Sequence, residues 1–145
     1  MANTTSQNGI LFIRRNEGVR LSIYDDNGHP AIGYGHDLTQ PEIFSGVYVN
    51  GITIDQAASL LQQDLTARYE PTVNELAPDA NQNQFDALVD FAYNLGGGAL
   101  KQMLAHGWDQ VPVQILRWCF INGEVSTALT ARREAEIELF NTPVS

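Results

Sequence analysis

The sequence has little of several things on which whole classes of protein depend. Cys119 is the only cysteine among 145 residues, so we expect a buried structural thiol with no internal disulfide and no thiolate metal cluster. No apolar run approaches the roughly 18 residues that a membrane-spanning helix needs. Residues 1–9 lack the basic and apolar regions of a secretory signal. We therefore expect a soluble chain with no signal peptide and no membrane insertion.

Basic residues are also scarce. Eight Lys and Arg stand against 17 Asp and Glu, for a net charge of −9. The imbalance is spread along the chain, with 8 acids and 4 bases in residues 1–70 and 9 acids and 4 bases in residues 71–145. Because nucleic-acid binding depends on clustered Lys and Arg, the sequence argues against a nucleic-acid partner. Recognition of an anionic polymer would have to depend on contacts inside a cleft.

The motifs of several enzyme classes are missing as well. The sequence has no Gly-x-Ser-x-Gly elbow, no phosphate-binding glycine loop and no His-Glu-x-x-His helix. The three histidines, His29, His36 and His106, do not have the spacing of zinc ligands. We therefore expect neither a metal nor a cofactor.

The first third of the chain contains the signals of a short helix and a small sheet. Residues 9–15 predict the helix, and residues 21–24 predict a strand that enters an Asp-Asn-Gly turn. Residues 31–36, AIGYGH, place two glycines beside an aromatic residue, which is typical of a tight strand or bulge.

Helical periodicity dominates the rest. Thr53 begins a capping box ahead of a long helix, which we expect to kink at Pro71 and to continue to Leu76. Further helices are predicted over residues 85–95, 112–120 and 129–140, with a turn at 122–123. This order indicates an α+β fold in one domain, residues 1–145, with a cleft between two lobes. The expected parts are an N-terminal helix and sheet lobe in 1–52, a linking helix in 53–76 and a larger helical lobe in 77–145.

Two carboxylates near the predicted sheet have the chemistry for glycosidic bond cleavage. That reaction needs one carboxylic acid to protonate the leaving oxygen, and usually a second carboxylate to activate water or stabilise positive charge. Glu17 lies at the end of the first predicted helix, and Asp26 lies in the turn after the first strand. Both positions also have ordinary structural explanations, so spacing alone leaves the two interpretations open.

A longer pattern around these carboxylates resembles a known family. Residues 17–36, EGVRLSIYDDNGHPAIGYGH, are similar to the signature of phage-type (T4-like) lysozymes and endolysins, glycoside hydrolase family 24, in which Glu-Gly-x-Arg-Leu-x-x-Tyr-x-Asp precedes Gly-x-Gly-His. Residues 81–100 and 131–140 resemble the central and closing helices of that family. The resemblance implies a lysozyme-like fold and a muramidase, which hydrolyses β-1,4 bonds between N-acetylmuramic acid and N-acetylglucosamine in bacterial peptidoglycan. It also implies a protein of the host cytoplasm that acts on the cell wall once released, and we expect a monomer.

The resemblance assigns roles to individual residues. Glu17 is the general acid, which burial would keep protonated by raising its pKa, and Asp26 is the second carboxylate, which positions or activates water. Arg132 matches an arginine that approaches the catalytic glutamate, with Arg133 as the alternative register. His36 matches a histidine with a structural role behind the cleft.

Aromatic and glycine residues are candidates for contact with the sugar. Tyr34 and Gly35 lie in the Gly-x-Gly-His segment and are candidate substrate-binding residues. Stacking on sugars is an option for Tyr34, Tyr48, Trp108 and Trp118, although Trp118 lies in an apolar run that favours core packing.

The sequence departs from the family pattern at one chemical position. Ala31 stands where relatives carry a threonine, and the turn after Asp26 is one residue shorter. Because alanine has no hydroxyl to hold water, two hypotheses follow. In the first, His29 takes over the water or attacks the sugar itself. In the second, Asp26 and water suffice, with lower activity than in relatives.

Ala31 also leaves two alternative functions open. One is a lytic transglycosylase, which forms an anhydro sugar instead of using water. The other is a catalytically weakened module that binds glycans. For an active enzyme, the net negative charge predicts better activity below about pH 6, where protonation of carboxylates weakens repulsion from an anionic wall.

Overall fold

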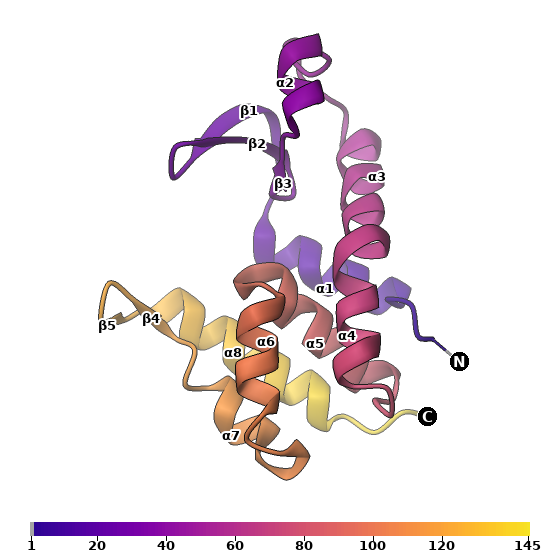
Figure 1. The fold of residues 1–145 in the computed structure, drawn as a ribbon, viewed down its shortest axis with the longest axis vertical. Helices are drawn as coiled ribbons and strands as arrows, with labels where there is room; N and C mark the ends of the chain where they lie inside the picture. Colours follow the sequence, from indigo (N-terminus) through magenta and orange to yellow (C-terminus); the bar gives the residue numbers. More distant parts are fainter. Residues whose placement is uncertain (1) are drawn as a thin grey trace.

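A small antiparallel sheet and a larger group of helices lie at opposite ends of one long helical segment in the computed structural model, which describes residues 2–145 (Figure 1). The α+β class expected from the sequence is confirmed. None of the helices in this range is long and apolar enough to cross a membrane.

The N-terminal region contains the first helix and the sheet. Its elements are α1 (Gln7–Glu17), β1 (Arg20–Asp26), β2 (His29–Gly33), β3 (His36–Asp37) and α2 (Gln40–Ser45), and the strands pair in the order β1-β2-β3. Asn27 and Gly28 join β1 to β2 with positive φ angles of 53° and 88°, as a two-residue hairpin turn requires. The sequence analysis did not predict α2, although Thr39 and Glu42 form a capping box at its start.

The long segment consists of α3 (Ile54–Asp64), a π-helical turn (Leu65–Tyr69) and α4 (Glu70–Leu76). The expected capping box of Thr53 and Gln56 begins it. The helix passes through Pro71 without a break, because the wider π turn precedes the proline and the Glu70 N–H donates to the Leu65 carbonyl.

The C-terminal region is built around α5. Its helices are α5 (Gln82–Leu95), α6 (Gly97–Leu104), a 3-10 turn (Trp108–Gln110), α7 (Val111–Ile115) and α8 (Thr127–Asn141). The predicted helix over residues 112–120 is wrong in its second half, because α7 ends at Ile115. Strand β4 (Phe120–Ile121) pairs instead with β5 (Glu124–Val125). The Asn-Gly turn at 122–123, with φ angles of 52° and 82°, favours this hairpin.

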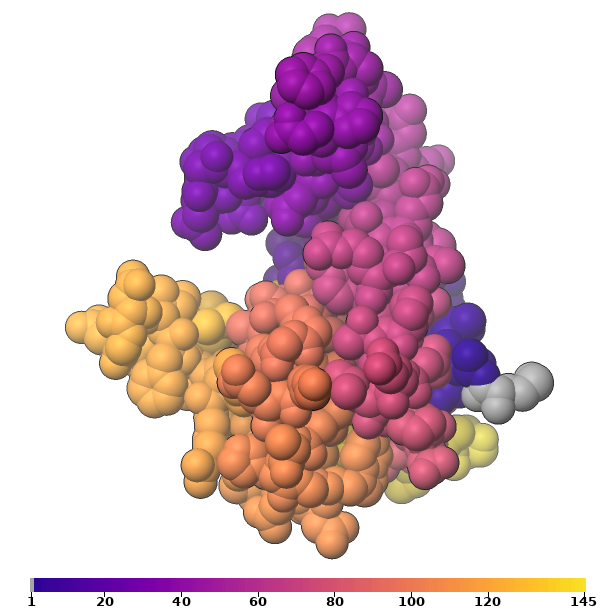
Figure 2. Space-filling model, viewed as in Figure 1, coloured from indigo at the N-terminus to yellow at the C-terminus, as the bar shows by residue number. Residues whose placement is uncertain are grey.

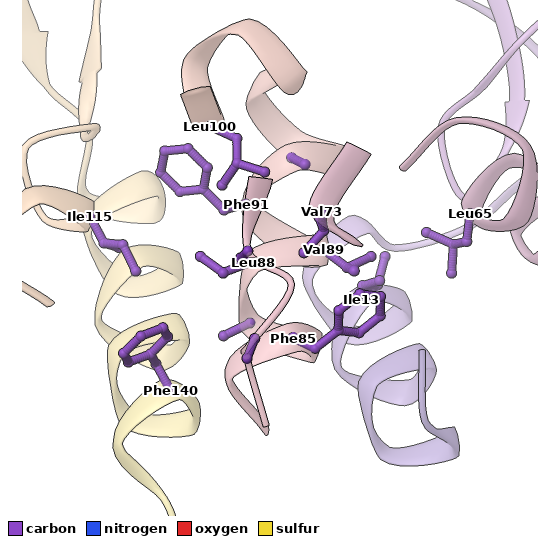
Figure 3. Close-up of a cluster of buried hydrophobic side chains, with 14 of the residues drawn as sticks. Ile13, Leu65, Val73, Phe85, Leu88, Val89, Phe91, Leu100, Ile115 and Phe140 are labelled. Atoms are coloured by element: carbon purple, nitrogen blue, oxygen red, sulfur yellow. The ribbon is translucent and has the colours of Figure 1, made fainter. Parts of the chain in front are cut away.

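Helix α5 lies at the centre of the core. Residues 85–92 are all buried, and Figure 3 shows Phe140 on one side of the helix and Ile13 on the other. Each fully buried side chain of this size contributes about 1.5–3 kcal/mol. The same helix buries Asp86 and Asp90 completely, and such charges require partners. Cys119 is buried, as expected.

Candidate active site

A polar cavity of about 450 Å³, here called the site cavity, brings together residues from the sheet, the long helical segment and α5. In Figure 2 the surface is hollowed between the sheet region, in purple, and the helical region, in orange and yellow. The cavity is lined by Glu17, Tyr24, Asp26, Asn27, Gly35, Asp37, Tyr69, Tyr93 and Asn94. The structure thus brings the two carboxylates expected from the sequence, Glu17 and Asp26, into one cavity.

Glu17 occupies the last position of α1. The helix ends there because Gly18 adopts a positive φ of 68° and its N–H donates to the Arg14 carbonyl. The Glu17 side chain is only 19% exposed, and Oε2 lies 2.7 Å from Nη1 of Arg132. Burial raises the pKa of Glu17 above its usual range, and the opposing effect of Arg132 is smaller. A carboxyl with a raised pKa suits the role of general acid.

Arg132 holds Glu17 against the helical core. Its Nε and Nη2 donate to the two carboxylate oxygens of Asp90 at 3.0 and 2.9 Å, while Nη1 reaches Glu17. Arg132 is 9% exposed and Asp90 is fully buried. Burial alone would lower the pKa of Arg132, but Asp90 and Glu17 together raise it, so the guanidinium stays charged and fixes α8 to both α1 and α5.

Arg133, the alternative register, points elsewhere. It is fully buried, and its Nη2 donates to Asn94 Oδ1 at 2.8 Å and to Glu136 Oε2 at 2.9 Å. Burial raises the pKa of Glu136. The two consecutive arginines therefore have different tasks, and it is Arg132 that approaches Glu17.

The register of the sheet explains which side chains enter the site cavity. Tyr24 and Asp26 are two residues apart on β1, so they share a face. Tyr24 pairs with Ala31 of β2, and Ala31 pairs in turn with Asp37 of β3. Directly opposite residues in antiparallel strands also share a face. Asp37, which the sequence analysis did not single out, therefore enters the cavity beside the expected Asp26.

Three tyrosines in the cavity were also missed. Tyr93 donates a hydrogen bond to the backbone carbonyl of Tyr34 at 2.7 Å and packs edge-to-face on Tyr69 with ring centroids 5.1 Å apart. Burial raises the pKa values of Tyr24, Tyr69 and Tyr93, so all three stay neutral. Neutral phenols offer an apolar ring with a polar edge, which suits a sugar. Only Tyr24 had a sequence signal, its spacing of two residues from Asp26.

Tyr34 is not available for stacking. The residue is only 5% exposed, and its hydroxyl accepts a hydrogen bond from Arg14 Nε at 2.9 Å. Gly35 does line the cavity, with φ of 93°, and a Cβ added there would lie 3.2 Å from Glu17 Oε1 and 3.5 Å from the Tyr93 hydroxyl. Tyr34 and Gly35 form the turn between β2 and β3, where the positive φ angles of Gly33 and Gly35 set the direction of the chain.

The other aromatic candidates also lie outside the lining of the cavity. Trp118 packs edge-to-face on Phe91 with centroids 5.8 Å apart, which agrees with its expected core position. Trp108 lies 5.2 Å from Phe140, and Tyr48 donates to Glu42 at 3.1 Å.

The two histidines near the sheet have separate surroundings. His29 is exposed and does not line the cavity; its Nε2 lies 3.2 Å from the Leu38 carbonyl. His36 points to the opposite face of β3 from Asp37, with Nδ1 2.8 Å from Asp64 and Nε2 2.9 Å from Glu42. The hydrogen bond with Asp64 is the main cause that raises the pKa of His36 to about 9. His36 thereby ties β3 to α3 and α2.

Within residues 2–145, no group of three or more His, Cys, Asp or Glu side chains is arranged to hold a metal ion. The polar groups of the site cavity are carboxyl groups, phenols and amides, with one buried guanidinium bound to Glu17.

The chain is similar in sequence to known phage lysozymes and endolysins. A profile described as phage lysozyme matches residues 14–136. The endolysin of Lactococcus phage c2 is 37% identical over 97% of this chain and 61% of its own length, and the endolysin of Salmonella phage P22 is 32% identical over 93% of this chain and 96% of its own. The chain thus spans about three fifths of the Lactococcus phage relative.

Two solved structures have a similar fold. The muramidase domain of SpmX from Asticaccaulis excentricus superposes with a TM-score of 0.81 at 33% identity, covering 97% of this chain and 99% of that domain. P22 lysozyme, solved as a mutant, superposes with a TM-score of 0.73 at 27% identity over 97% and 99% of the two chains.

Proposed function

The chain belongs to the phage lysozyme family, and from that premise we propose that it is a muramidase that hydrolyses β-1,4 bonds between N-acetylmuramic acid and N-acetylglucosamine in bacterial peptidoglycan. Glu17 is the proposed general acid and Asp26 the proposed second carboxylate. The partner is the peptidoglycan glycan strand, which the enzyme reaches after release from the host cytoplasm.

The observation that carries this proposal is the different setting of the two carboxylates in one cavity. Glu17 is largely buried against Arg132, and burial raises its pKa. Asp26 lies at the exposed tip of the β1–β2 hairpin. One buried carboxyl with a raised pKa and one exposed carboxyl form the kind of pair that glycosidic cleavage uses.

In the proposed reaction, the Glu17 carboxyl donates its proton to the glycosidic oxygen as the bond from that oxygen to the anomeric carbon breaks. Positive charge develops on the sugar ring, close to the Asp26 carboxylate. A water oxygen then bonds to the anomeric carbon, and the proton that it loses passes to Asp26. The phenols of Tyr24, Tyr69 and Tyr93 provide stacking surface and hydrogen-bond donors for the sugars.

The test is the release of soluble fragments from purified peptidoglycan by the parent protein and by Glu17→Gln, which keeps the shape of the side chain and removes the acid. We expect a loss of at least about 100-fold. Glu75→Gln is the matched control, because Glu75 is an exposed glutamate of α4 outside the site cavity. Full activity of Glu17→Gln would refute the assignment, and an inactive parent would refute the proposed function.

Product chemistry separates hydrolysis from the lytic transglycosylase alternative, which Ala31 favours because it has no hydroxyl to hold water. Mass spectrometry of the digested wall gives the answer. Hydrolysis leaves a hydrated reducing end, whereas a transglycosylase leaves an end lighter by one water.

A further inference from the structure

Ala31 lies in the middle of a cross-strand row on the cavity face of the sheet. It pairs with Tyr24 on one side and with Asp37 on the other, and it is fully buried. Tyr24 and Asp37 both line the site cavity. The row therefore offers a phenol and a carboxylate to the cavity, with a methyl group between them.

The carboxylate of Asp37 can reach the region above Ala31. Side chains directly opposite in antiparallel strands have Cβ atoms about 4.5–5.5 Å apart. The Asp37 carboxylate therefore lies beside the Ala31 methyl group on the same face of the sheet. A hydroxyl on residue 31 would lie on this face next to Asp37, and the alanine methyl group cannot hydrogen-bond to water there.

The Asp37 side chain is not engaged in holding the described part of the fold together. Among residues 2–145 its side chain has no hydrogen-bond or ion-pair partner, whereas the carboxylates behind the sheet are engaged: Asp64 and Glu42 both bind His36. Asp37 also lies close enough to Tyr24 to contribute, with Asp26 and Glu17, to the raised pKa of that phenol. All three carboxylates line the site cavity together with Tyr24.

We propose that Asp37 is a water-positioning residue, which does with a carboxylate what a hydroxyl at position 31 would do. This inference rests on the proposed muramidase function. The attacking water donates one hydrogen to Asp37 and the other to Asp26, which leaves a lone pair directed at the anomeric carbon. As the new carbon–oxygen bond forms and the glycosidic bond breaks, the proton shared with Asp26 transfers to Asp26, and the hydrogen bond to Asp37 is kept in the product hydroxyl.

The first test is Asp37→Asn, with Asp25→Asn as the matched control. Asp25 is on the same hairpin and of the same charge, but it pairs with Pro30 on the face turned away from Tyr24 and Asp26. An asparagine at position 37 has only one oxygen that can accept a hydrogen bond, and it carries no charge. We expect kcat on peptidoglycan to fall roughly 10–100-fold with KM changed less than about 3-fold, and the fraction of anhydro ends to rise, because water is delivered poorly.

The second test restores a hydroxyl. In the double variant Ala31→Thr/Asp37→Asn we expect kcat to recover at least about 3-fold over Asp37→Asn, and the anhydro fraction to fall. Thermal unfolding of each variant verifies folding, and Asp37→Ser gives a second substitution at the same exposed position.

The outcomes distinguish failure of the proposed role of Asp37 from failure of the proposed muramidase function. If the parent cleaves peptidoglycan in a Glu17-dependent way and Asp37→Asn equals Asp25→Asn in kcat and products, the role of Asp37 is refuted and the muramidase proposal stands. If the parent itself releases no fragments, the muramidase proposal fails and the role of Asp37 fails with it.

Discussion

The guanidinium of Arg132 lies 2.7 Å from the carboxylate of Glu17 while its other nitrogens bind Asp90 at 3.0 and 2.9 Å. One side chain therefore holds the proposed acid in position and lowers its pKa against the larger effect of burial. Because Asp90 is fully buried, this arrangement also ties the site to the core. The two consequences can be measured separately.

The first prediction concerns stability. Arg132→Gln leaves the buried Asp90 without its counter-charge, which typically costs about 3–5 kcal/mol. We expect that loss in the free energy of unfolding measured with urea. Adding Asp90→Asn removes the unpaired charge, so the double variant should recover at least half of the loss. A double variant as unstable as Arg132→Gln would show that lost packing, and not the buried charge, dominates.

The second prediction concerns pH. Arg132 lowers the pKa of Glu17 in opposition to burial, and Asp90 raises it by a smaller amount, so removing both charges together still raises that pKa. A general acid works only when protonated, and kcat/KM falls as pH rises through its pKa. In Arg132→Gln/Asp90→Asn we therefore expect the alkaline limb of the pH profile to move to higher pH than in the parent. An unmoved limb would mean that another group sets it.

The third prediction concerns the close approach of Gly35 to Glu17. In Gly35→Ala the new Cβ would lie 3.2 Å from Glu17 Oε1 at a φ of 93°. We expect a loss of about 1–3 kcal/mol in stability from the strained backbone, together with a fall of at least 10-fold in kcat as Glu17 is displaced. Gly107→Ala is the control, because Gly107 has φ of 102° with nothing within 4 Å of the added Cβ. It should lose stability and keep its activity.

Gly35 is one of the site residues that could be predicted from the sequence. The signature segment predicted Glu17, Asp26 and Gly35 as site residues, and all three line the cavity, because their placement depends on local features: a helix end, a hairpin turn and a glycine at positive φ. Asp37 was missed although it follows Gly35 by two residues. Its direction depends on strand register, which is fixed only once β3 pairs with β2.

Sequence-based prediction missed the site residues that come from distant segments of the chain. Tyr69 and Tyr93 enter the cavity from the π turn and from α5, and no local pattern specifies that these helices meet there. The 112–120 segment failed for a related reason. The spacing of its apolar residues is that of a helix, but the Asn-Gly turn at 122–123 favours a hairpin in which Phe120 and Ile121 form a strand.

The fourth prediction decides between the hypotheses for His29. Its Nε2 lies 3.2 Å from the Leu38 carbonyl, and because a carbonyl only accepts, Nε2 carries the proton in this contact. The ring lies outside the lining of the site cavity. We therefore expect His29→Ala to keep kcat within twofold of the parent. A loss of tenfold or more would restore His29 as the group that handles water and would argue against Asp37.

The fifth prediction uses His36 as a built-in test of how the sheet is attached. Hydrogen bonds from His36 to Asp64 and Glu42 raise its pKa from 6.5 to about 9. The folded protein therefore holds this proton more tightly than the unfolded chain. The stabilisation is complete below about pH 6.5 and is lost as pH rises to about 9. We expect the free energy of unfolding to fall on the order of 2–3 kcal/mol across this range. In His36→Asn the slope should flatten, whereas His29→Asn should retain it; an equal slope in His36→Asn and the parent would assign the pH dependence to other groups.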